Sequence, residues 1–247
     1  DTSESVLCEE VGKAFHLLAV SLIAHGMDEK GLEFLNEALD FKEKGQSFFD
    51  SKIGNITISD SLHWIGVAYG HVGDLDNALS HLKQALVIRR ELLGNDDLRV
   101  AETCHKMGST LCEVGKLDDA TKLLEEALRI RQDKLDEGHE SIAETEEWMG
   151  NVLREQRDYD RALEFYRQSL NSKREIFGGS HEEVANATYT LAITLDGAGK
   201  YEAAIMNFKE ALRIRNSLYG RGIILADTYL CMGNTYLELG KESDAYE

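Results

Sequence analysis

The chain has 247 residues, of which 43% are hydrophobic and 29% charged, a composition typical of an ordered protein. Its 27 basic and 45 acidic residues give a formal net charge of −18, which argues against nucleic acid and anionic membranes as partners and favours basic protein segments. No apolar run approaches the roughly 18 residues of a membrane-spanning helix, so we expect no membrane insertion. Four cysteines in a chain of this length indicate a reduced, intracellular compartment rather than a disulfide framework. We expect the cytoplasm, with an organelle left open because the chain starts at Asp1 rather than Met.

The sequence repeats itself with a period of 42 residues. One register is marked by small residues with spacings of 42, 42, 42 and 41: Gly66, Gly108, Gly150, Ala192 and Gly233. The first repeat is longer by about five residues, near the stretch GQSFFDSKIGN. We therefore predict five repeats and a partial sixth, at about residues 12–58, 59–100, 101–142, 143–184, 185–225 and 226–247.

Each repeat is predicted to form two amphipathic helices, called helix A and helix B below. In the third repeat, helix A has apolar residues at helical spacing, namely Cys104, Met107, Leu111 and Val114. The apolar positions of its helix B are Ala120, Leu123, Leu124, Ala127, Leu128 and Ile130. Between A and B comes a glycine that suits the left-handed end of a helix, in chain order Gly73, Gly115, Gly199 and Gly240.

Charged residues gather at both ends of the predicted B helices. Asp118 and Asp119 begin one of them, and Arg129, Arg131, Arg213 and Arg215 lie near helix ends, which the helix dipole explains without a ligand. The stretch FGGSHEEVA at 177–185 has a histidine between a serine and two glutamates, as some catalytic sites do. We interpret it as a corner between helices, in which Ser180 and Glu183 have the spacing of a capping box.

The small and apolar positions also carry a family resemblance. In the second repeat they are Ile65, Gly66, Tyr69, Ala78, Leu82 and Ala85, and in the fifth Leu191, Ala192, Leu195, Ala204, Phe208 and Ala211. This pattern resembles the tetratricopeptide repeat, and the 42-residue period resembles its long, kinesin-light-chain-like subgroup. The resemblance implies an all-α fold, a right-handed superhelical solenoid of antiparallel helix pairs, as a single domain over residues 1–247. It also implies a non-catalytic protein-binding scaffold.

This sequence departs from the subgroup at two places. The slot of the subgroup's proline at the start of helix A holds Leu98, Glu140 and Glu182. The slots of its paired asparagines hold His105-Lys106, Glu147-Trp148 and Tyr189-Thr190. These departures argue against a kinesin-cargo role.

In such a solenoid, helix A lines the concave face. The acidic groove positions predicted from this register are Asp60, Glu102, Glu113, Glu144, Glu147, Glu155, Asp196, Asp227 and Glu238, against three basic positions, Lys13, Lys106 and Arg154. We therefore expect the ligand to be a basic or mixed-charge peptide or protein segment. The candidate contact residues are His16, His63, His105, Lys106, Glu147, Trp148, Asn151, Arg154, Asn186, Tyr189 and Asn234.

Two recurring residue types leave alternatives open. One helix A position holds a histidine in three successive repeats, namely His16, His63 and His105. These histidines are ordinary polar groove residues, contacts for a ligand, or metal ligands, and the sequence leaves the three interpretations open. Trp64 and Trp148 share another position, either for packing between repeats or as an aromatic anchor for a ligand. Cys104 falls at a core position and is expected to be buried.

We find no phosphate loop, nucleophile elbow or metalloprotease motif, so we assign no catalytic residue, cofactor or metal. Two functions follow. The first is a non-catalytic scaffold or adaptor that binds a partner segment. The second is a regulatory or targeting domain of a larger protein, or a subunit of a stable complex. Because the last segment stops inside a helix B, we expect its apolar side to be capped by further chain or by a partner.

Overall fold

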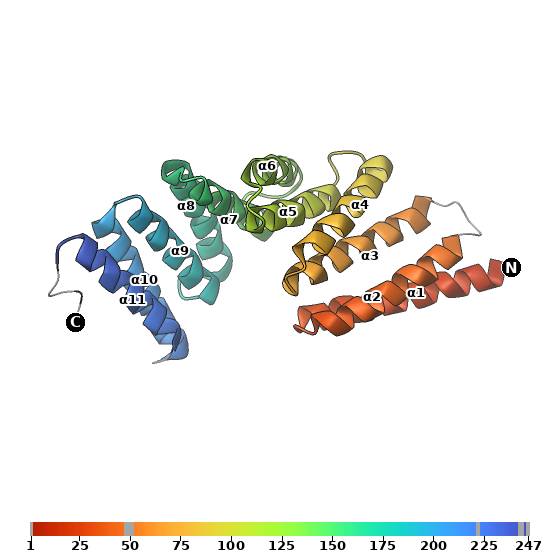
Figure 1. Ribbon diagram of the computed structural model, residues 1–247, viewed down its shortest axis with the longest axis horizontal. Helices are drawn as coiled ribbons and strands as arrows, with labels where there is room; N and C mark the ends of the chain where they lie inside the picture. The colour runs from red at the N-terminus through yellow and green to blue at the C-terminus, as the bar shows by residue number, and fades with distance from the viewer. Residues whose placement is uncertain (1, 47–51, 221–222, 242–244, 246–247) are drawn as a thin grey trace. The chain divides into compact units, whose positions relative to one another are not determined.

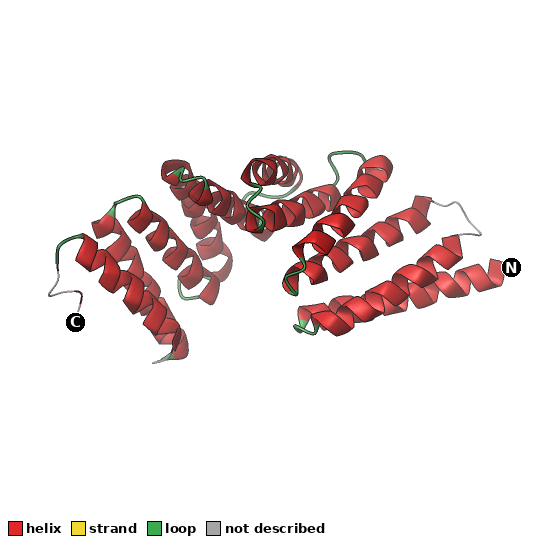
Figure 2. Ribbon diagram, in the orientation of Figure 1, coloured by secondary structure: helices red, strands yellow, loops and turns green. Residues whose placement is uncertain are grey.

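The computed structural model describes residues 2–46, 52–220, 223–241 and 245, and in these ranges the chain forms eleven α-helices and no strand (Figures 1 and 2). The helices are α1 (Thr2–Ala24), α2 (Asp28–Gln46), α3 (Lys52–His71), α4 (Leu75–Leu93), α5 (Leu98–Glu113), α6 (Leu117–Lys134), α7 (Glu140–Glu155), α8 (Tyr159–Phe177), α9 (Glu182–Gly197), α10 (Tyr201–Tyr219) and α11 (Ile223–Glu238). Within the described ranges, no helix has the length and apolar character needed to span a bilayer. The predicted alternation of A and B helices is confirmed.

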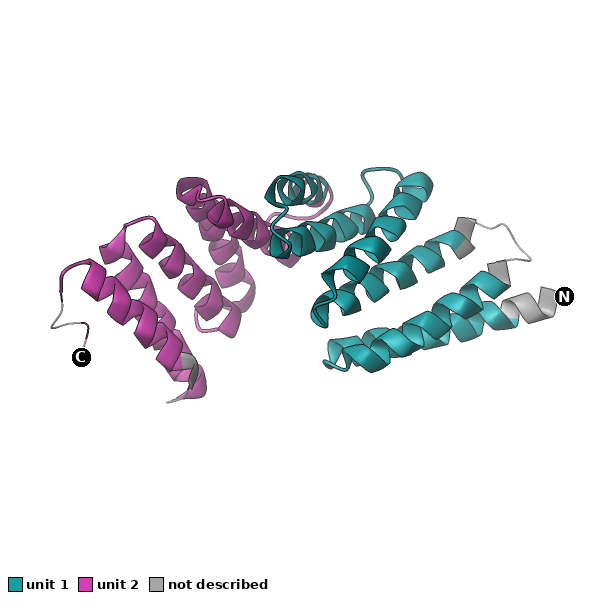
Figure 3. Ribbon diagram, viewed as in Figure 1, with its two compact units in different colours: residues 1–130 teal, residues 131–247 magenta. Residues whose placement is uncertain are grey.

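The chain divides into two compact units, Asp1–Ile130 and Arg131–Glu247, called unit 1 and unit 2 (Figure 3). In unit 1, α1 packs on α2, α2 on α3, α3 on α4 and α4 on α5. In unit 2, the helices from α7 to α11 pack in the same successive way. Each unit is therefore a stack of helix pairs. A single solenoid domain through residues 1–247 stays a prediction.

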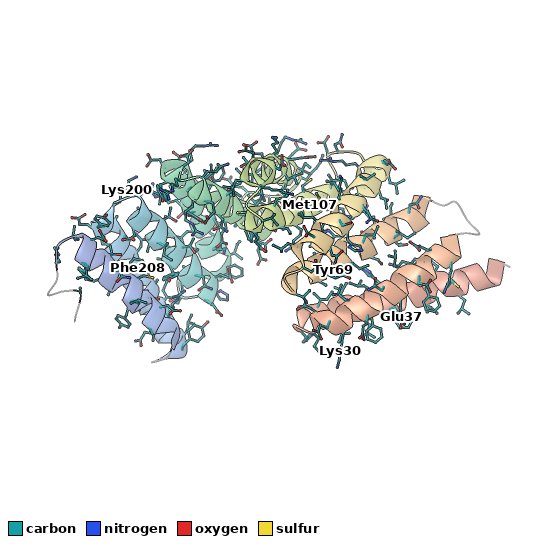
Figure 4. All side chains as sticks on the ribbon, viewed as in Figure 1. Lys30, Glu37, Tyr69, Met107, Lys200 and Phe208 are labelled. Atoms are coloured by element: carbon teal, nitrogen blue, oxygen red, sulfur yellow. The ribbon has the colours of Figure 1, made fainter. Side chains whose placement is uncertain are left out.

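Small residues let the two helices of a pair approach closely. A Cβ atom added to Gly108 on α5 would lie 2.7 Å from a side-chain carbon of Leu124, and one added to Gly150 would lie 2.7 Å from the ring of Tyr166. These distances are shorter than real contacts allow, so a larger residue would force the helices apart. Buried apolar residues such as Phe208 fill the remaining space, whereas Lys30 and Glu37 on α2 are exposed (Figure 4).

Side chains at one repeated position cap the A helices. Asp97, His139 and His181 each accept a hydrogen bond from the backbone N–H two residues ahead, at 2.9, 3.2 and 3.2 Å. The capping box predicted for Ser180 and Glu183 is therefore wrong. His181 caps α9 and stacks on Phe177 with 4.6 Å between ring centroids. The histidine of FGGSHEEVA thus has a structural role at a helix corner.

Candidate functional site

A buried basic side chain lies near the end of helix B in each of the first five repeats. The five residues share one register and are Lys42, Arg89, Arg131, Lys173 and Arg215. All are buried, and Arg89 is only 2% exposed. Their spacing repeats that of the small residues of helix A, which makes them a regular feature of the repeat rather than isolated charges.

In unit 1, Arg89 joins the A helices on either side of its own helix α4. It donates to Asp60 Oδ1 on α3 at 2.7 Å, and to Glu102 Oε2 and Thr103 Oγ1 on α5 at 3.2 and 2.7 Å. It also donates to the Arg99 carbonyl at 2.8 Å. Hydrogen bonds from a buried guanidinium to charged acceptors are among the stronger ones in proteins. Arg89 therefore holds three consecutive helices together.

Unit 2 repeats this arrangement with different partners. Arg131 donates to Thr145 Oγ1 at 2.6 Å, and Arg215 donates to Thr228 Oγ1 at 2.6 Å and to Asn186 Oδ1 at 3.0 Å. The basic residue of the fourth repeat has other partners, because Ala187 at the start of the fifth repeat stands where the neighbouring repeats have threonine. There Lys173 donates instead to Glu147 Oε2 at 2.6 Å and Glu183 Oε2 at 2.9 Å.

The basic side chains change the charge balance predicted for the groove. Asp60 and Glu102 pair with Arg89, and Glu147 pairs with Lys173. Counting charges on helix A alone therefore overstates the acidic excess. The balancing positive charges come from helix B, from bases that the sequence alone explains as partners of the helix dipole. These five bases follow the spacing of the repeats, first 47 residues and then 42 three times, and this spacing is the signal by which the sequence reveals them.

Two of the four candidate residues of unit 1 lie deep between the helices. His63 and His105 are 1% and 2% exposed, so they present almost no surface to a ligand. His16 is partly buried, and its Nδ1 lies 3.2 Å from Ser61 Oγ. Burial, helped by the charge of Lys42, lowers the pKa of His16 to about 4. Burial also lowers the pKa of His63 well below its usual value. Both imidazoles are thus neutral at physiological pH.

Ser61 lies between His16 and Lys42, an arrangement that resembles a serine nucleophile with two possible bases. Lys42 donates to Ser61 Oγ at 2.8 Å, and burial lowers the pKa of Lys42 to about 8. Ser61 is 0% exposed, however, so no substrate carbonyl can reach its hydroxyl. The cluster packs α1, α2 and α3 together. Lys106 on α5, the fourth candidate in unit 1, is half-buried.

The candidate residues of unit 2 are more accessible. Glu147, Trp148, Asn151 and Arg154 on α7, and Asn186 and Tyr189 on α9, are all partly exposed, and Asn234 on α11 is exposed. The structure thus places them on the A helices, as the register predicts.

Several of them are held in place by neighbours. Asn151 Oδ1 accepts a hydrogen bond from the Tyr166 hydroxyl at 2.7 Å. The guanidinium of Arg215 lies 4.5 Å from the ring centroid of Tyr189, and the Tyr189 hydroxyl lies 3.3 Å from Cys231 Sγ. Burial and this contact with the thiol raise the pKa of Tyr189 to about 12. Asn151 and Tyr189 therefore have defined orientations before any partner binds.

The remaining candidates for chemistry are accounted for by packing. Cys104 is a free, fully buried cysteine, as predicted, and burial raises its pKa to about 12. Trp64 packs against a buried cluster that includes Ile65 and Ala68. Throughout the part of the chain that the structure describes, no three histidine, cysteine or acidic side chains are grouped as metal ligands would be.

Stacked helix pairs, joined by buried side chains and without strands in the described ranges, define an all-α helical-repeat protein of the solenoid class. The family model of the tetratricopeptide repeat matches residues 57–133 and 141–217, more than half of the chain. The chain belongs to the tetratricopeptide repeat family, whose repeats form scaffolds for interaction between proteins.

Solved structures share this fold at low sequence identity. BtubC (BKLC) from P. vanneervenii is 18% identical, with a TM-score of 0.73 over 89% of this chain and 87% of that chain. A putative kinesin light chain of Podosopora anserina with nearly identical TPR-like repeats is 18% identical, with a TM-score of 0.68 over 85% and 97%. PilW, a type IV pilus biogenesis factor, is 18% identical, with a TM-score of 0.69 over 96% and 89%. No curated protein sequence matches the chain.

Proposed function

We propose that the chain is a non-catalytic adaptor that binds a basic or mixed-charge segment of a partner protein along its A helices. In unit 2, the contact surface consists of the partly exposed polar and aromatic side chains of α7 and α9, with Asn234 on α11. Unit 1 has accessible candidates of its own in Lys106 and His16, since His63 and His105 are buried.

The observation that carries this proposal is the fixed orientation of the polar side chains on α7 and α9. Tyr166 holds Asn151, and Arg215 holds Asn186 and Tyr189. Side chains that are ordered before binding lose little conformational entropy when a ligand arrives.

Trp148 adds an apolar anchor to this surface. It is partly exposed on α7, three residues from Asn151, and residues at this spacing share one side of a helix. Aromatic side chains in such settings contribute much of the binding energy at protein interfaces. A partner segment would thus meet an indole and oriented amides on one helix.

The charge of the chain supports a basic ligand. Acidic residues outnumber basic ones in both units, and the helix A acids Glu144 and Glu155 are exposed in unit 2. Such a field attracts a basic segment and repels an acidic one. Because exposed charges are screened by salt, the affinity should fall as ionic strength rises.

The test uses a displayed library of random peptides selected on the immobilised chain. We expect enrichment of lysine and arginine over aspartate and glutamate, and weaker binding of the selected peptides at high salt. The double variant Trp148→Ala/Asn151→Ala should bind them at least about tenfold more weakly, as expected for the loss of an interface anchor. Glu164→Ala, an exposed change on α8, is the matched control. Selection of acidic peptides, or full binding by the double variant, would refute the proposal.

A further inference from the structure

Glu146 on α7 places a carboxylate at a position that belongs to the core in other repeats. The equivalent residues are Leu62, Cys104 and Thr188, and all three are buried. Glu146 is itself only 7% exposed, and its Oε2 atom is buried without a hydrogen-bond partner among the described residues. Burial raises the pKa of this carboxyl to about 7. An unpartnered buried carboxylate destabilises a fold, so packing alone does not explain this residue.

Glu146 lines a hollow of about 870 Å³ within unit 2, between the end of α6, the loop after it, α7 and α8. Its other polar lining residues are two carboxylates, three amides and one hydroxyl: Glu137, Glu175, Gln132, Gln168, Asn171 and Ser172. None of the side chains that line the hollow is basic. The hollow therefore has hydrogen-bond acceptors and negative charge, and lacks a cation of its own.

The preceding repeat fills the equivalent place with its own guanidinium group. Three positions correspond at a distance of 42 residues: Arg90 and Gln132, Cys104 and Glu146, and Glu126 and Gln168. In unit 1, Arg90 Nη2 lies 3.9 Å from Cys104 Sγ and donates to Glu126 Oε2 at 2.6 Å. In unit 2, both members of this ion pair are replaced by glutamine, and an acid stands where the cysteine does.

We propose that this hollow binds the guanidinium group of an arginine residue from a partner protein, with the Glu146 carboxylate as its counter-ion. The side-chain carbonyl oxygens of Gln132 and Gln168 accept further hydrogen bonds from it. A guanidinium has five N–H donors in a planar fork that matches a carboxylate, whereas an ammonium is a compact, strongly hydrated charge. The arginine of the partner protein would thus take the place that Arg90 of this chain occupies in the preceding repeat.

This site is separate from the surface proposed above. Successive residues of an α-helix are about 100° apart around its axis, so Glu146 lies about 150° from the side shared by Glu147, Trp148 and Asn151. The proposal therefore does not rest on the proposed function. A ligand at Glu146 would be insensitive to the Trp148→Ala/Asn151→Ala variant, which separates failure of one proposal from failure of the other.

The experiment is a titration of the full chain with Nα-acetyl-arginine N-methylamide. Binding is measured by calorimetry and by the NMR signal of the Glu146 carboxyl carbon. The lysine and citrulline analogues of this probe serve as comparisons, because citrulline keeps the shape of arginine without its charge. We expect weak but saturable binding of the arginine probe. Binding should strengthen between pH 6 and 8 as Glu146 loses its proton. The other titratable groups that face the hollow are the carboxyls of Glu137 and Glu175.

Three variants define the site. Glu146→Gln should weaken the binding of the arginine probe at least about tenfold, as expected for the loss of a charged hydrogen-bond acceptor. Gln132→Arg should also block the probe, because it introduces the guanidinium that Arg90 provides in the preceding repeat. Glu144→Gln, an exposed change of the same charge on the same helix, should bind the probe normally. Circular dichroism checks that all three variants are folded.

Each other outcome overturns the proposal. Unchanged binding to Glu146→Gln would place the probe elsewhere. Equal binding of the citrulline analogue would exclude recognition of charge, and equal binding of the lysine analogue would exclude a site built for a guanidinium. Tighter binding of free L-arginine than of the capped probe would assign the hollow to a small molecule instead of a partner protein. Absence of saturable binding by the arginine probe would remove the site altogether.

Discussion

Replacing Glu146 with glutamine should stabilise the chain at neutral and alkaline pH. Glutamine keeps the shape of a protonated glutamate, but it has no proton to lose. The pKa of Glu146 is raised from 4.5 to about 7 by burial. Well below pH 4.5 the carboxyl is protonated in both the folded and the unfolded chain, so its titration does not change the free energy of unfolding. As pH rises, the unfolded chain loses this proton first, and the folded state becomes less stable.

The size of the effect follows from the two pKa values. A difference of one pKa unit corresponds to about 1.4 kcal/mol, so the burial of Glu146 destabilises the fold by at most about 3 kcal/mol above pH 7. At pH 5 the destabilisation is about 1 kcal/mol, because most of the unfolded chains but few folded ones have lost the proton. Glu146→Gln removes this term. It should therefore raise the free energy of unfolding by about 2 kcal/mol more at pH 8 than at pH 5.

Urea unfolding followed by circular dichroism at both pH values measures this difference. Glu144→Gln is the control, since it removes an equal charge from an exposed position of α7 and should shift stability equally little at both pH values. A stabilisation by Glu146→Gln that is the same at pH 5 and pH 8, or that is matched by Glu144→Gln, would refute the assignment of a raised pKa to the Glu146 carboxyl.

Four further predictions test the packing described above. Arg89→Ala should lower the free energy of unfolding by about 3 kcal/mol in urea titrations, and Arg89→Met by less, because a methionine refills the buried space. Gly150→Ala should cost about 1–3 kcal/mol in the same assay, because its Cβ would lie 2.7 Å from the ring of Tyr166. His181→Ala should lower the free energy of unfolding by about 1 kcal/mol through loss of the α9 cap, and an effect near zero would show that the imidazole does not stabilise the start of α9. Cys104 should react with iodoacetamide only as fast as the chain unfolds, because it is 0% exposed with a pKa raised to about 12.

Helical periodicity and the small residues of helix A were enough to predict the fold. They record which side of a helix is buried and how closely two helices approach, and both are local properties of the sequence. The capping box failed because the cap depends on exact reach. The imidazole of His181 reaches the N–H of Glu183, while the Glu183 carboxylate is taken by Lys173 from another helix.

The depth of a side chain was harder to predict than its direction. The register placed His63 and His105 on helix A correctly, but it did not show that Arg89 and Thr103 would pack beside His63. Likewise the basic residues at the ends of the B helices look like partners of the helix dipole. Arg215 instead donates a buried hydrogen bond to Thr228 in the next repeat. The sequence pattern of one helix does not predict such a contact between two repeats.

Two departures from the repeat pattern occur close together, Glu146 in the fourth repeat and Ala187 at the start of the fifth, and they differ in how their surroundings compensate for them. Ala187 replaces the threonine that would receive the basic side chain of helix B, and the chain compensates with two carboxylates that bind Lys173. Glu146 replaces a core residue, yet Gln132 provides no charge to balance it. A departure balanced within the chain is explained by packing. One left unbalanced at an open hollow is not explained by packing, and for this reason we assign the proposed binding site to Glu146 and not to Lys173.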